Sequence, residues 1–416
     1  MVPCISAPAE PVVLLDEPWS GITRSRGIGA LMSASKIVEV ICQGSAREMG
    51  LAQGAGLQHK IHGARHVLAK LEAFRLQQPW WLPYSGYRWL AERKASDFLT
   101  RALNRHHPAL SQRLAGIAEG AGIGLRTIHL FNALEPVLSS VGGCTACPGA
   151  CSAIAVRGRR SITGEPMVAR NFDYLPLIQP YYLIRESRPQ GRLRAFEFTT
   201  APLVGAVDGM NEAGLCIIYN YGFTTDEPTG PAVPISMAIS EALEQCSTVA
   251  EAAEMIISTP RWGGGLLMLC DASGDIASLE LSSTRSHLRR PAPGEDVLFH
   301  TNAFSSDHMR EVQIPWKAVY TDRAPTPLRG RRLHQSSQLR DQRFEELLGE
   351  AERLGAEELA AIMADHGPTG TPDDNTPCMH SSYWNTTACL QFFPKSRRIR
   401  VSYSSACQAH YEEAQL

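Results

Sequence analysis

The spacing of apolar side chains divides the chain into a helical first third and a mixed remainder. Over residues 45–74 the apolar positions fall on one face and histidine and lysine fill the other, which predicts an amphipathic helical region. The same periodicity predicts helices over residues 87–105, 108–121 and 128–138, with Thr127 as the N-cap of the last helix.

From residue 151 onward, apolar and polar positions alternate instead. Residues 151–156 and 167–174 are two short apolar runs joined by a polar segment with two glycines, which predicts a β-hairpin. Further strands are expected over residues 36–40, 181–186, 193–199, 214–221, 265–271, 276–281, 386–393 and 399–403, and further helices over 234–246, 248–259, 337–354 and 356–365. Strands, then helices, then strands again behind a helical segment predict an α+β protein with stacked layers rather than a parallel βαβ array.

Composition excludes several function classes. The 416 residues carry a net charge of -2, which offers no electrostatic basis for binding nucleic acid or an anionic membrane. No apolar run is long enough to span a bilayer. The first residues lack the basic and apolar regions of a secretory signal, so a cytoplasmic protein is expected. Residues 1–35 contain four prolines without periodicity and are expected to be a disordered extension, with Met32 as an alternative start.

The eleven cysteines raise the question of a reactive thiol. A chain of this length does not need disulfides, and most of these cysteines are expected to be small buried hydrophobes. Cys151 differs because it directly follows a loop of glycine, proline and small residues over 142–150 and begins an apolar strand. A thiol at a loop-to-strand junction is uninformative alone, so its significance depends on the motifs around it.

Five further motifs follow Cys151. They are Ala169-Arg-Asn-Phe-Asp-Tyr174, Asp208-Gly-Met-Asn-Glu-Ala-Gly-Leu215 leading into Cys216-Ile-Ile-Tyr-Asn220, His300-Thr-Asn-Ala-Phe304, Ser336-Ser-Gln-Leu-Arg-Asp-Gln-Arg343 and Cys378-Met-His380. In this order they resemble the acyl-coenzyme A:6-aminopenicillanate acyltransferase family and its relatives, the choloylglycine hydrolases, which are N-terminal-nucleophile (Ntn) hydrolases. The resemblance runs over about residues 37–410. It implies a four-layer αββα sandwich, with residues 36–150 as a mainly helical pro-segment and 151–416 as the catalytic chain.

The resemblance also implies that the chain cuts itself between Ala150 and Cys151. The thiol would attack the Ala150 carbonyl, and water would then release the pro-segment. Cys151 would be left with a thiol and a free α-amine, whose pKa is ordinarily about 7.7–8.0. Such an amine can accept and return a proton at neutral pH, so the thiol needs no histidine partner.

The remaining roles are carried over by position. Asp173 would accept a hydrogen bond from the α-amine, and Arg170 would lie near the thiol and favour thiolate. Asn220 and Asn302 would donate to the tetrahedral oxyanion, and Arg340 would position Asp173 or a substrate carboxylate. Four of these residues have a structural alternative: a turn for Asp173, a strand end for Asn220, a cap for Asn302 and an ordinary solvated position for Arg340.

The implied activity is hydrolysis or acyl transfer on an N-acyl small molecule or peptide amide. Water or an amine would take the acyl group, and an acyl donor such as acyl-coenzyme A is a candidate partner, although the sequence offers no phosphate-binding motif for it. No cofactor is implied. The choice between hydrolase and acyltransferase stays open, as does a homo-oligomeric assembly.

Two features leave other interpretations open. Ala150 stands where glycine is expected, and a bulkier residue there would slow cleavage because glycine eases a strained peptide; an uncleaved, non-enzymatic homologue is therefore an alternative. Cys144, in a Gly-Cys-Thr string, is a rival nucleophile. A strand starting there would run into Pro148 and Gly149, which do not belong inside a central strand, so Cys151 is favoured.

A different class of protein would use several cysteines together. Cys144, Cys147 and Cys151 could bind zinc with Cys378 or His380, and the first two could form a redox pair. Neither interpretation accounts for the asparagine- and aspartate-bearing motifs that follow, so both are ranked below the Ntn interpretation.

Overall fold

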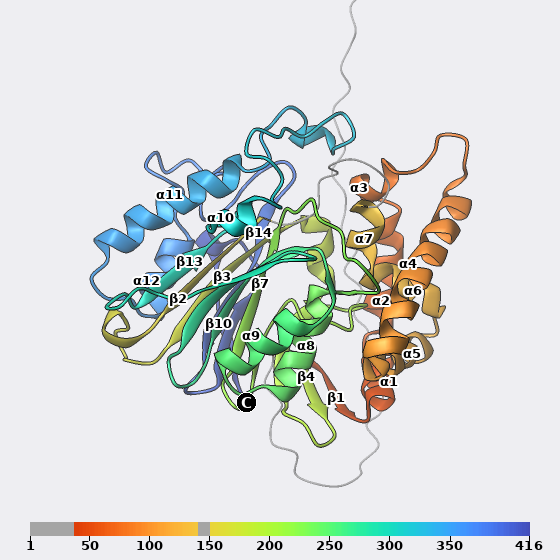
Figure 1. Ribbon diagram of the computed structural model, residues 1–416, viewed down its shortest axis with the longest axis horizontal. Coiled ribbons are helices and arrows are strands. Elements are labelled where there is room, and N and C mark those ends of the chain that lie inside the picture. The colour runs from red at the N-terminus through yellow and green to blue at the C-terminus, as the bar shows by residue number, and fades with distance from the viewer. Residues whose placement is uncertain (1–36, 140–149) are drawn as a thin grey trace, which may run out of the picture. The chain divides into compact units, whose positions relative to one another are not determined.

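The computed structural model describes residues 37–139 and 150–416 (Figure 1). The expected extension over residues 1–35, the alternative start at Met32, and the loop cysteines Cys144 and Cys147 lie outside the described residues. Ser35–Leu416 forms a single compact unit, so the helical N-terminal segment and the following sheets are described together.

After the strand β1, the described chain is helical up to residue 139, and it is mixed from residue 150 onward. The helices are α1 (Ala46–Gly56), α2 (Gln58–Leu68), α3 (Glu72–Arg75), α4 (Tyr84–His106), α5 (Pro108–Ala121), α6 (Leu125–Asn132), α7 (Leu134–Ser139), α8 (Ile235–Gln245), α9 (Val249–Ser258), α10 (Asp307–Arg310), α11 (Gln335–Glu350) and α12 (Ala356–Met363). The strands are β1 (Val38–Gly44), β2 (Ala150–Val156), β3 (Met167–Tyr174), β4 (Tyr182–Pro189), β5 (Ala195–Thr200), β6 (Asp208–Asn211), β7 (Cys216–Gly222), β8 (Val233–Pro234), β9 (Arg261–Trp262), β10 (Gly264–Cys270), β11 (Ile276–Leu281), β12 (Ser286–Arg289), β13 (Val297–His300), β14 (Asn385–Phe393), β15 (Arg398–Ser402) and β16 (Glu412–Gln415).

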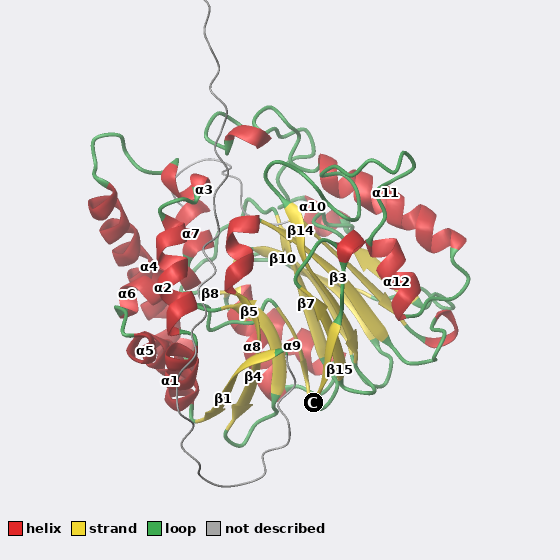
Figure 2. Ribbon diagram, turned by 180° about the vertical axis from the view of Figure 1, so that it is seen from behind, coloured by secondary structure: helices red, strands yellow, loops and turns green. Residues whose placement is uncertain are grey.

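Two large sheets stack on each other (Figure 2). The first has the strand order β1-β4-β5-β6-β7-β10-β11-β12, and the second has the order β13-β2-β3-β14-β15-β16. Strand β1 pairs in parallel with β4, so the segment before the helices supplies an edge strand to the first sheet. The hairpin predicted from residues 151–174 is the antiparallel pair β2–β3, which lies inside the second sheet between β13 and β14.

Three apolar clusters show that the sheets are sandwiched between helices. One cluster fills the space between the two sheets and includes Ile218 and Leu390. A second packs the outer face of the first sheet, through Leu267, against α8 and α9. A third packs the outer face of the second sheet, through Ile154, against Phe344 of α11 and residues of α12. The four-layer αββα sandwich expected from the sequence is therefore confirmed, with α11 and α12 covering one side (Figure 1).

The N-terminal helices require glycine where α1 and α5 meet. A Cβ atom on Gly54 would lie 2.4 Å from the Ile117 carbonyl oxygen, and a Cβ on Gly50 would lie 2.1 Å from another backbone oxygen of α5. Gly116 and Gly120 of α5 approach the backbone of α1 in the same way. Because the facing atoms are backbone, a side chain at these positions would force the helices apart.

One prediction for the N-terminal helices is confirmed and one is wrong. The helical region expected over residues 45–74 consists of three helices, α1, α2 and α3, with Leu57 between the first two. Thr127 is not the N-cap of a helix; it lies inside α6, which Gly124 precedes. Its hydroxyl instead donates to Glu92 of α4 at 2.9 Å, a tertiary contact that outweighs its local capping preference. No helix in the described residues is both long and apolar enough to cross a membrane.

Candidate active site

Cys151 is the second residue of β2 and lies in the interior. Its side chain belongs to the cluster between the two sheets, with Ala153 and Ala155 on the same face, whereas Ile154 packs toward α11 and α12. This alternation is the two-residue period of a strand. The thiol therefore faces the first sheet, while the backbone of Cys151 remains within reach of side chains from α11.

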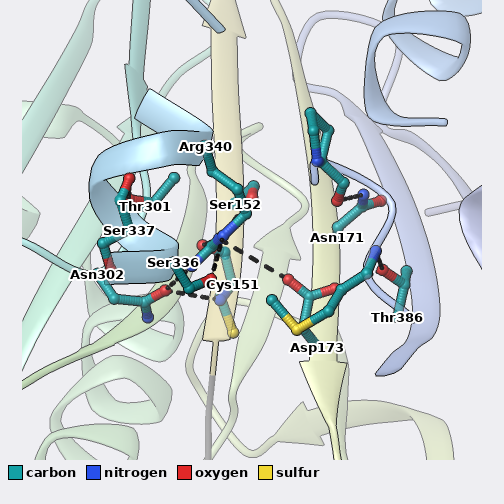
Figure 3. Close-up of polar contacts among 12 residues, drawn as sticks. Cys151, Ser152, Asn171, Asp173, Thr301, Asn302, Ser336, Ser337, Arg340 and Thr386 are labelled. Carbon is teal, nitrogen blue, oxygen red and sulfur yellow. Dashed lines mark hydrogen bonds and ion pairs between the residues drawn. The ribbon is translucent and has the colours of Figure 1, made fainter. Parts of the chain in front are cut away.

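Arg340 of α11 links the groups around Cys151, as Figure 3 shows. Its guanidinium donates to the Cys151 carbonyl oxygen at 2.7 Å and to the Ser152 hydroxyl at 2.9 Å. It also donates to Asn302 Oδ1 at 2.9 Å and to the Ser336 hydroxyl at 3.1 Å. The side chain is fully buried, so the solvated-helix alternative for Arg340 is wrong.

Asp173 of β3 lies beside the same guanidinium, with Oδ2 3.9 Å from Arg340 Nη1. The other oxygen, Oδ1, accepts a hydrogen bond from the Thr386 hydroxyl at 2.6 Å. Oδ2 is buried and has no hydrogen-bond partner among the described residues. Burial raises the pKa of Asp173 to about 6, with the Arg340 charge acting in the opposite direction. The site thus contains a buried carboxylate oxygen that can still accept a hydrogen bond.

Arg170 points to the opposite face of β3, as its three-residue separation from Asp173 requires. It lies between the sheets, where its Nε is 2.6 Å from Asp208 Oδ2 of β6. Its Nη1 donates to Asn220 Oδ1 of β7, and its Nη2 donates to Cys151 Sγ at 3.4 Å. Burial raises the pKa of the Cys151 thiol and outweighs the lowering by Arg170. The structure therefore places Arg170 at the thiol as expected, whereas burial favours the protonated form of the thiol.

The two asparagines present their amide oxygens to the cationic and N–H groups of the site. Asn302, just after β13, accepts from the Cys151 backbone N–H at 2.8 Å through Oδ1, and its Nδ2 donates to the Tyr221 carbonyl at 2.8 Å. Asn220 Nδ2 donates to the Thr301 carbonyl at 2.9 Å and to the His300 carbonyl at 3.4 Å. Donation by these two amides to an oxyanion stays a prediction. Asn302 has a further contact that was not predicted, because its Oδ1 accepts a hydrogen bond from the nitrogen of Cys151.

An apolar pocket opens onto Cys151. The N-terminal helices contribute Val67, Leu68 and Phe131 to its lining, and the sheets contribute Phe172 and Tyr221. The pocket thus lies between the expected pro-segment and the expected catalytic chain, and its walls match an apolar group better than a charged one.

Among the described residues that line this pocket, Glu135 is the one acid. Burial raises the pKa of its carboxyl to about 8, with a hydrogen bond from Tyr221 lowering it in part. The carboxyl is therefore mostly uncharged at neutral pH, which keeps the pocket apolar.

Sequence reasoning brought together Cys151, Arg170, Asp173, Asn220, Asn302 and Arg340, and the structure places all six within one connected network. It did not single out Asp208 or Thr386. Asp208 begins one of the motifs quoted above. Because a buried arginine needs a counter-charge, this acidic residue was a candidate partner for Arg170 from the sequence alone. Nothing in the sequence marks Thr386, since a threonine at a strand start is common.

A four-layer αββα sandwich with a buried cysteine at the start of a central strand defines the Ntn-hydrolase class. The chain belongs to the acyl-coenzyme A:6-aminopenicillanic acid acyl-transferase family, whose model matches residues 162–405, more than half of the sequence. It is therefore an Ntn-type amide hydrolase or acyltransferase. The matched residues include Arg170, Asp173, Asn302 and Arg340 and begin after Cys151.

Solved structures with similarity to the chain include an acid amidase ortholog, a bile acid hydrolase and a penicillin V acylase. An N-acylethanolamine-hydrolyzing acid amidase ortholog from Caenorhabditis elegans is 13% identical, with a TM-score of 0.40, over 64% of this chain and 100% of its own. A conjugated bile acid hydrolase mutant from Clostridium perfringens is 10% identical, with a TM-score of 0.38, over 64% and 92%. Penicillin V acylase from Agrobacterium tumefaciens is 15% identical, with a TM-score of 0.35, over 63% and 84%. No curated protein matches the chain.

Proposed function

We propose that the chain cuts itself between Ala150 and Cys151 and then cleaves N-acyl amides through an acyl thioester on Cys151. The observation that carries the proposal is the environment of the Cys151 nitrogen. That nitrogen donates to Asn302 Oδ1, and Asp173, paired with Ala150 across the β2–β3 ladder, keeps a buried oxygen without a hydrogen-bond partner among the described residues. An α-amine formed at Cys151 has two acceptors close to it.

In the cleavage step, Cys151 Sγ attacks the Ala150 carbonyl carbon. The C–N bond breaks, the nitrogen of Cys151 takes up the thiol proton and becomes an amine, and Ala150 is held as a thioester. Water then hydrolyses the thioester, giving a carboxylate on Ala150 and restoring the thiol. Arg340 holds the Cys151 carbonyl during these steps, and residues 36–150 stay associated as the pro-segment.

In turnover, the α-amine accepts the thiol proton and the sulfur attacks the substrate carbonyl. Asn302 supplies an amide proton to the oxyanion, because an NH2 group carries two protons and its Nδ2 is bound to a single carbonyl. Asn220 Nδ2 donates to two carbonyls, those of His300 and Thr301, so Asn220 contributes a proton only if one of these hydrogen bonds is released. The amine of the substrate leaves with the proton from the α-ammonium. Water, or an acceptor amine, then attacks the thioester with the α-amine as base and releases the acyl group.

The substrate class follows from the pocket. Its lining is mainly aliphatic and aromatic, so we assign it to the acyl group of an N-acyl amide. Each methylene buried there stabilises the bound state by about 0.8 kcal/mol, which corresponds to roughly a fourfold gain in kcat/KM per methylene until the pocket is filled.

The test is a series of N-acyl aminocoumarin amides of increasing acyl length, assayed with the purified protein. We expect kcat/KM to rise with acyl length and activity to vanish in Cys151→Ala. Cys246→Ala is the matched control, because Cys246 is also a buried free cysteine but lies in the cluster beneath α8 and α9. Equal activity in wild type and Cys151→Ala would refute the role of Cys151, and indifference to acyl length would refute the pocket assignment.

A further inference from the structure

Four sulfur- and nitrogen-bearing side chains meet on the far side of the second sheet from the Cys151 thiol. His366 follows α12, Cys378 and His380 lie in the loop that leads to β14, and Cys407 lies in the short 3-10 helix Ala406–Gln408 after β15. One donor atom from each of these residues lies within 4.8 Å of every other. The four residues are referred to below as the Cys/His cluster.

The distances within the Cys/His cluster suit tetrahedral coordination. His380 Nε2 lies 3.3 Å from Cys378 Sγ and 3.5 Å from Cys407 Sγ. Zinc binds thiolate sulfur at about 2.3 Å and imidazole nitrogen at about 2.0–2.1 Å, so two such ligands on a tetrahedron are separated by about 3.6 Å. The two distances from His380 Nε2 to the cysteine sulfurs therefore match the distances expected when all three atoms bind the same metal ion.

The second histidine completes the set. The ring centroids of His366 and His380 are 5.3 Å apart and the rings are inclined at 77°. His366 Nε2 is buried and has no hydrogen-bond partner among the described residues. A buried ring nitrogen without a partner is costly in free energy, and a metal ion is one group that satisfies a neutral imidazole beside thiols.

We infer that His366, Cys378, His380 and Cys407 form a closed four-ligand metal site of the Cys2His2 type, suited to Zn²⁺. Binding would release the two thiol protons, so that two thiolates balance the charge of the ion and both histidines bind as neutral imidazoles. Four protein ligands leave no position for a substrate, which makes the site structural rather than catalytic. The zinc site considered from the sequence combined Cys144, Cys147 and Cys151 with Cys378 or His380. The four-ligand site inferred here keeps Cys378 and His380 and uses none of the other three cysteines.

The site would hold the loop that supports Asp173. Between the two loop ligands lies Met379, whose N–H donates to the Thr386 hydroxyl oxygen at 2.8 Å. That hydroxyl in turn donates to Asp173 Oδ1 at 2.6 Å. The loop is also fixed at Pro377, whose carbonyl accepts from Asn171 Nδ2 at 2.9 Å. A metal ion that ties this loop to α12 and to the segment after β15 would therefore stabilise the side of the second sheet that carries Asp173.

The experiment measures zinc in the purified full-length protein after removal of any affinity tag and dialysis against metal-free buffer. We expect stoichiometric zinc in the wild type and in Cys246→Ser, and its loss in Cys407→Ser. Cys407 is exposed, so Cys407→Ser is expected to fold. Replacement of zinc by Co²⁺ should give the visible absorption of a tetrahedral thiolate site in the wild type and not in Cys407→Ser.

A second variant separates this site from the nucleophile. Cys151→Ser should retain zinc, because Cys151 is not among the four ligands. Loss of zinc in Cys151→Ser would overturn the assignment. So would a protein that binds neither Zn²⁺ nor Co²⁺, whether mass spectrometry then finds Cys378 and Cys407 as free thiols or joined in a disulfide.

Discussion

Thr386→Val removes the hydroxyl that joins Asp173 to the loop before β14 and keeps nearly the same side-chain volume. The hydroxyl makes two buried hydrogen bonds, accepting from the Met379 N–H and donating to Asp173 Oδ1, and Thr386 is only 2% exposed. A hydrogen bond to a charged group contributes about 1.5–3 kcal/mol, and a buried N–H left without a partner costs about 1–3 kcal/mol. We therefore expect Thr386→Val to lower the free energy of unfolding by about 2.5–6 kcal/mol at pH 7.5.

The assay is denaturant unfolding in a Cys151→Ala background, where the proposed cleavage cannot occur and a single chain unfolds. Thr386→Ser is the matched control: it keeps the hydroxyl and loses one buried methyl group, which costs about 1 kcal/mol. The difference between Thr386→Val and Thr386→Ser should narrow at pH 4.5, because a protonated Asp173 makes a weaker, neutral hydrogen bond. Equal midpoints for the two variants at pH 7.5 would refute this account of the contact.

Three further predictions follow from the structure. Gly54→Ala should destabilise the fold by about 1–3 kcal/mol in denaturant unfolding, because its Cβ would meet the backbone of α5, whereas Gly349→Ala, at an exposed site with open space around it, should be neutral or stabilising; the reverse order would contradict the close approach. Burial raises the pKa of Asp173 to about 6 from an ordinary 3.8, so the folded state binds the proton more tightly than the unfolded state and loses stability as the pH rises from 4 through 6. In a Cys151→Ala background, Asp173→Asn should remove that loss of stability. Parallel plots of unfolding free energy against pH, with and without Asp173→Asn, would contradict this prediction. If the pocket binds the acyl group, the KM of the wild type should rise above pH 8 as Glu135 ionises, and Glu135→Gln should flatten this rise. The same dependence of KM on pH in the wild type and in Glu135→Gln would show that the charge of Glu135 does not affect substrate binding.

The fold was predictable from the sequence wherever the pattern is local and strong. The strands around Cys151 and Asp173 alternate cleanly and were expected within one residue of their observed limits. The helix over residues 108–121 was also expected correctly, since a proline begins it and Gly122, at φ 63°, ends it. Short strands such as β13 and β16 were missed because four residues carry too little pattern.

The candidate site was predictable as a set of residues and not as a network of contacts. The family motifs brought Arg170 and Arg340 to Cys151, and strand parity placed Arg170 and Asp173 on opposite faces of β3. Which atom of Asn302 faces Cys151 depends on the Tyr221 carbonyl and on Arg340, which come from distant parts of the chain. The same limit applies to Cys407, which joins the Cys/His cluster only through tertiary packing.

The central claim is that Cys151 acts as an N-terminal nucleophile, and the intact mass of the purified protein tests it most directly. We predict two fragments in the wild type, one of which begins at Cys151, and a single uncut chain in Cys151→Ala. The larger fragment should gain the mass of one acyl group when it is quenched during turnover of an N-acyl amide. A wild-type chain that remains whole and still hydrolyses such amides would contradict the account.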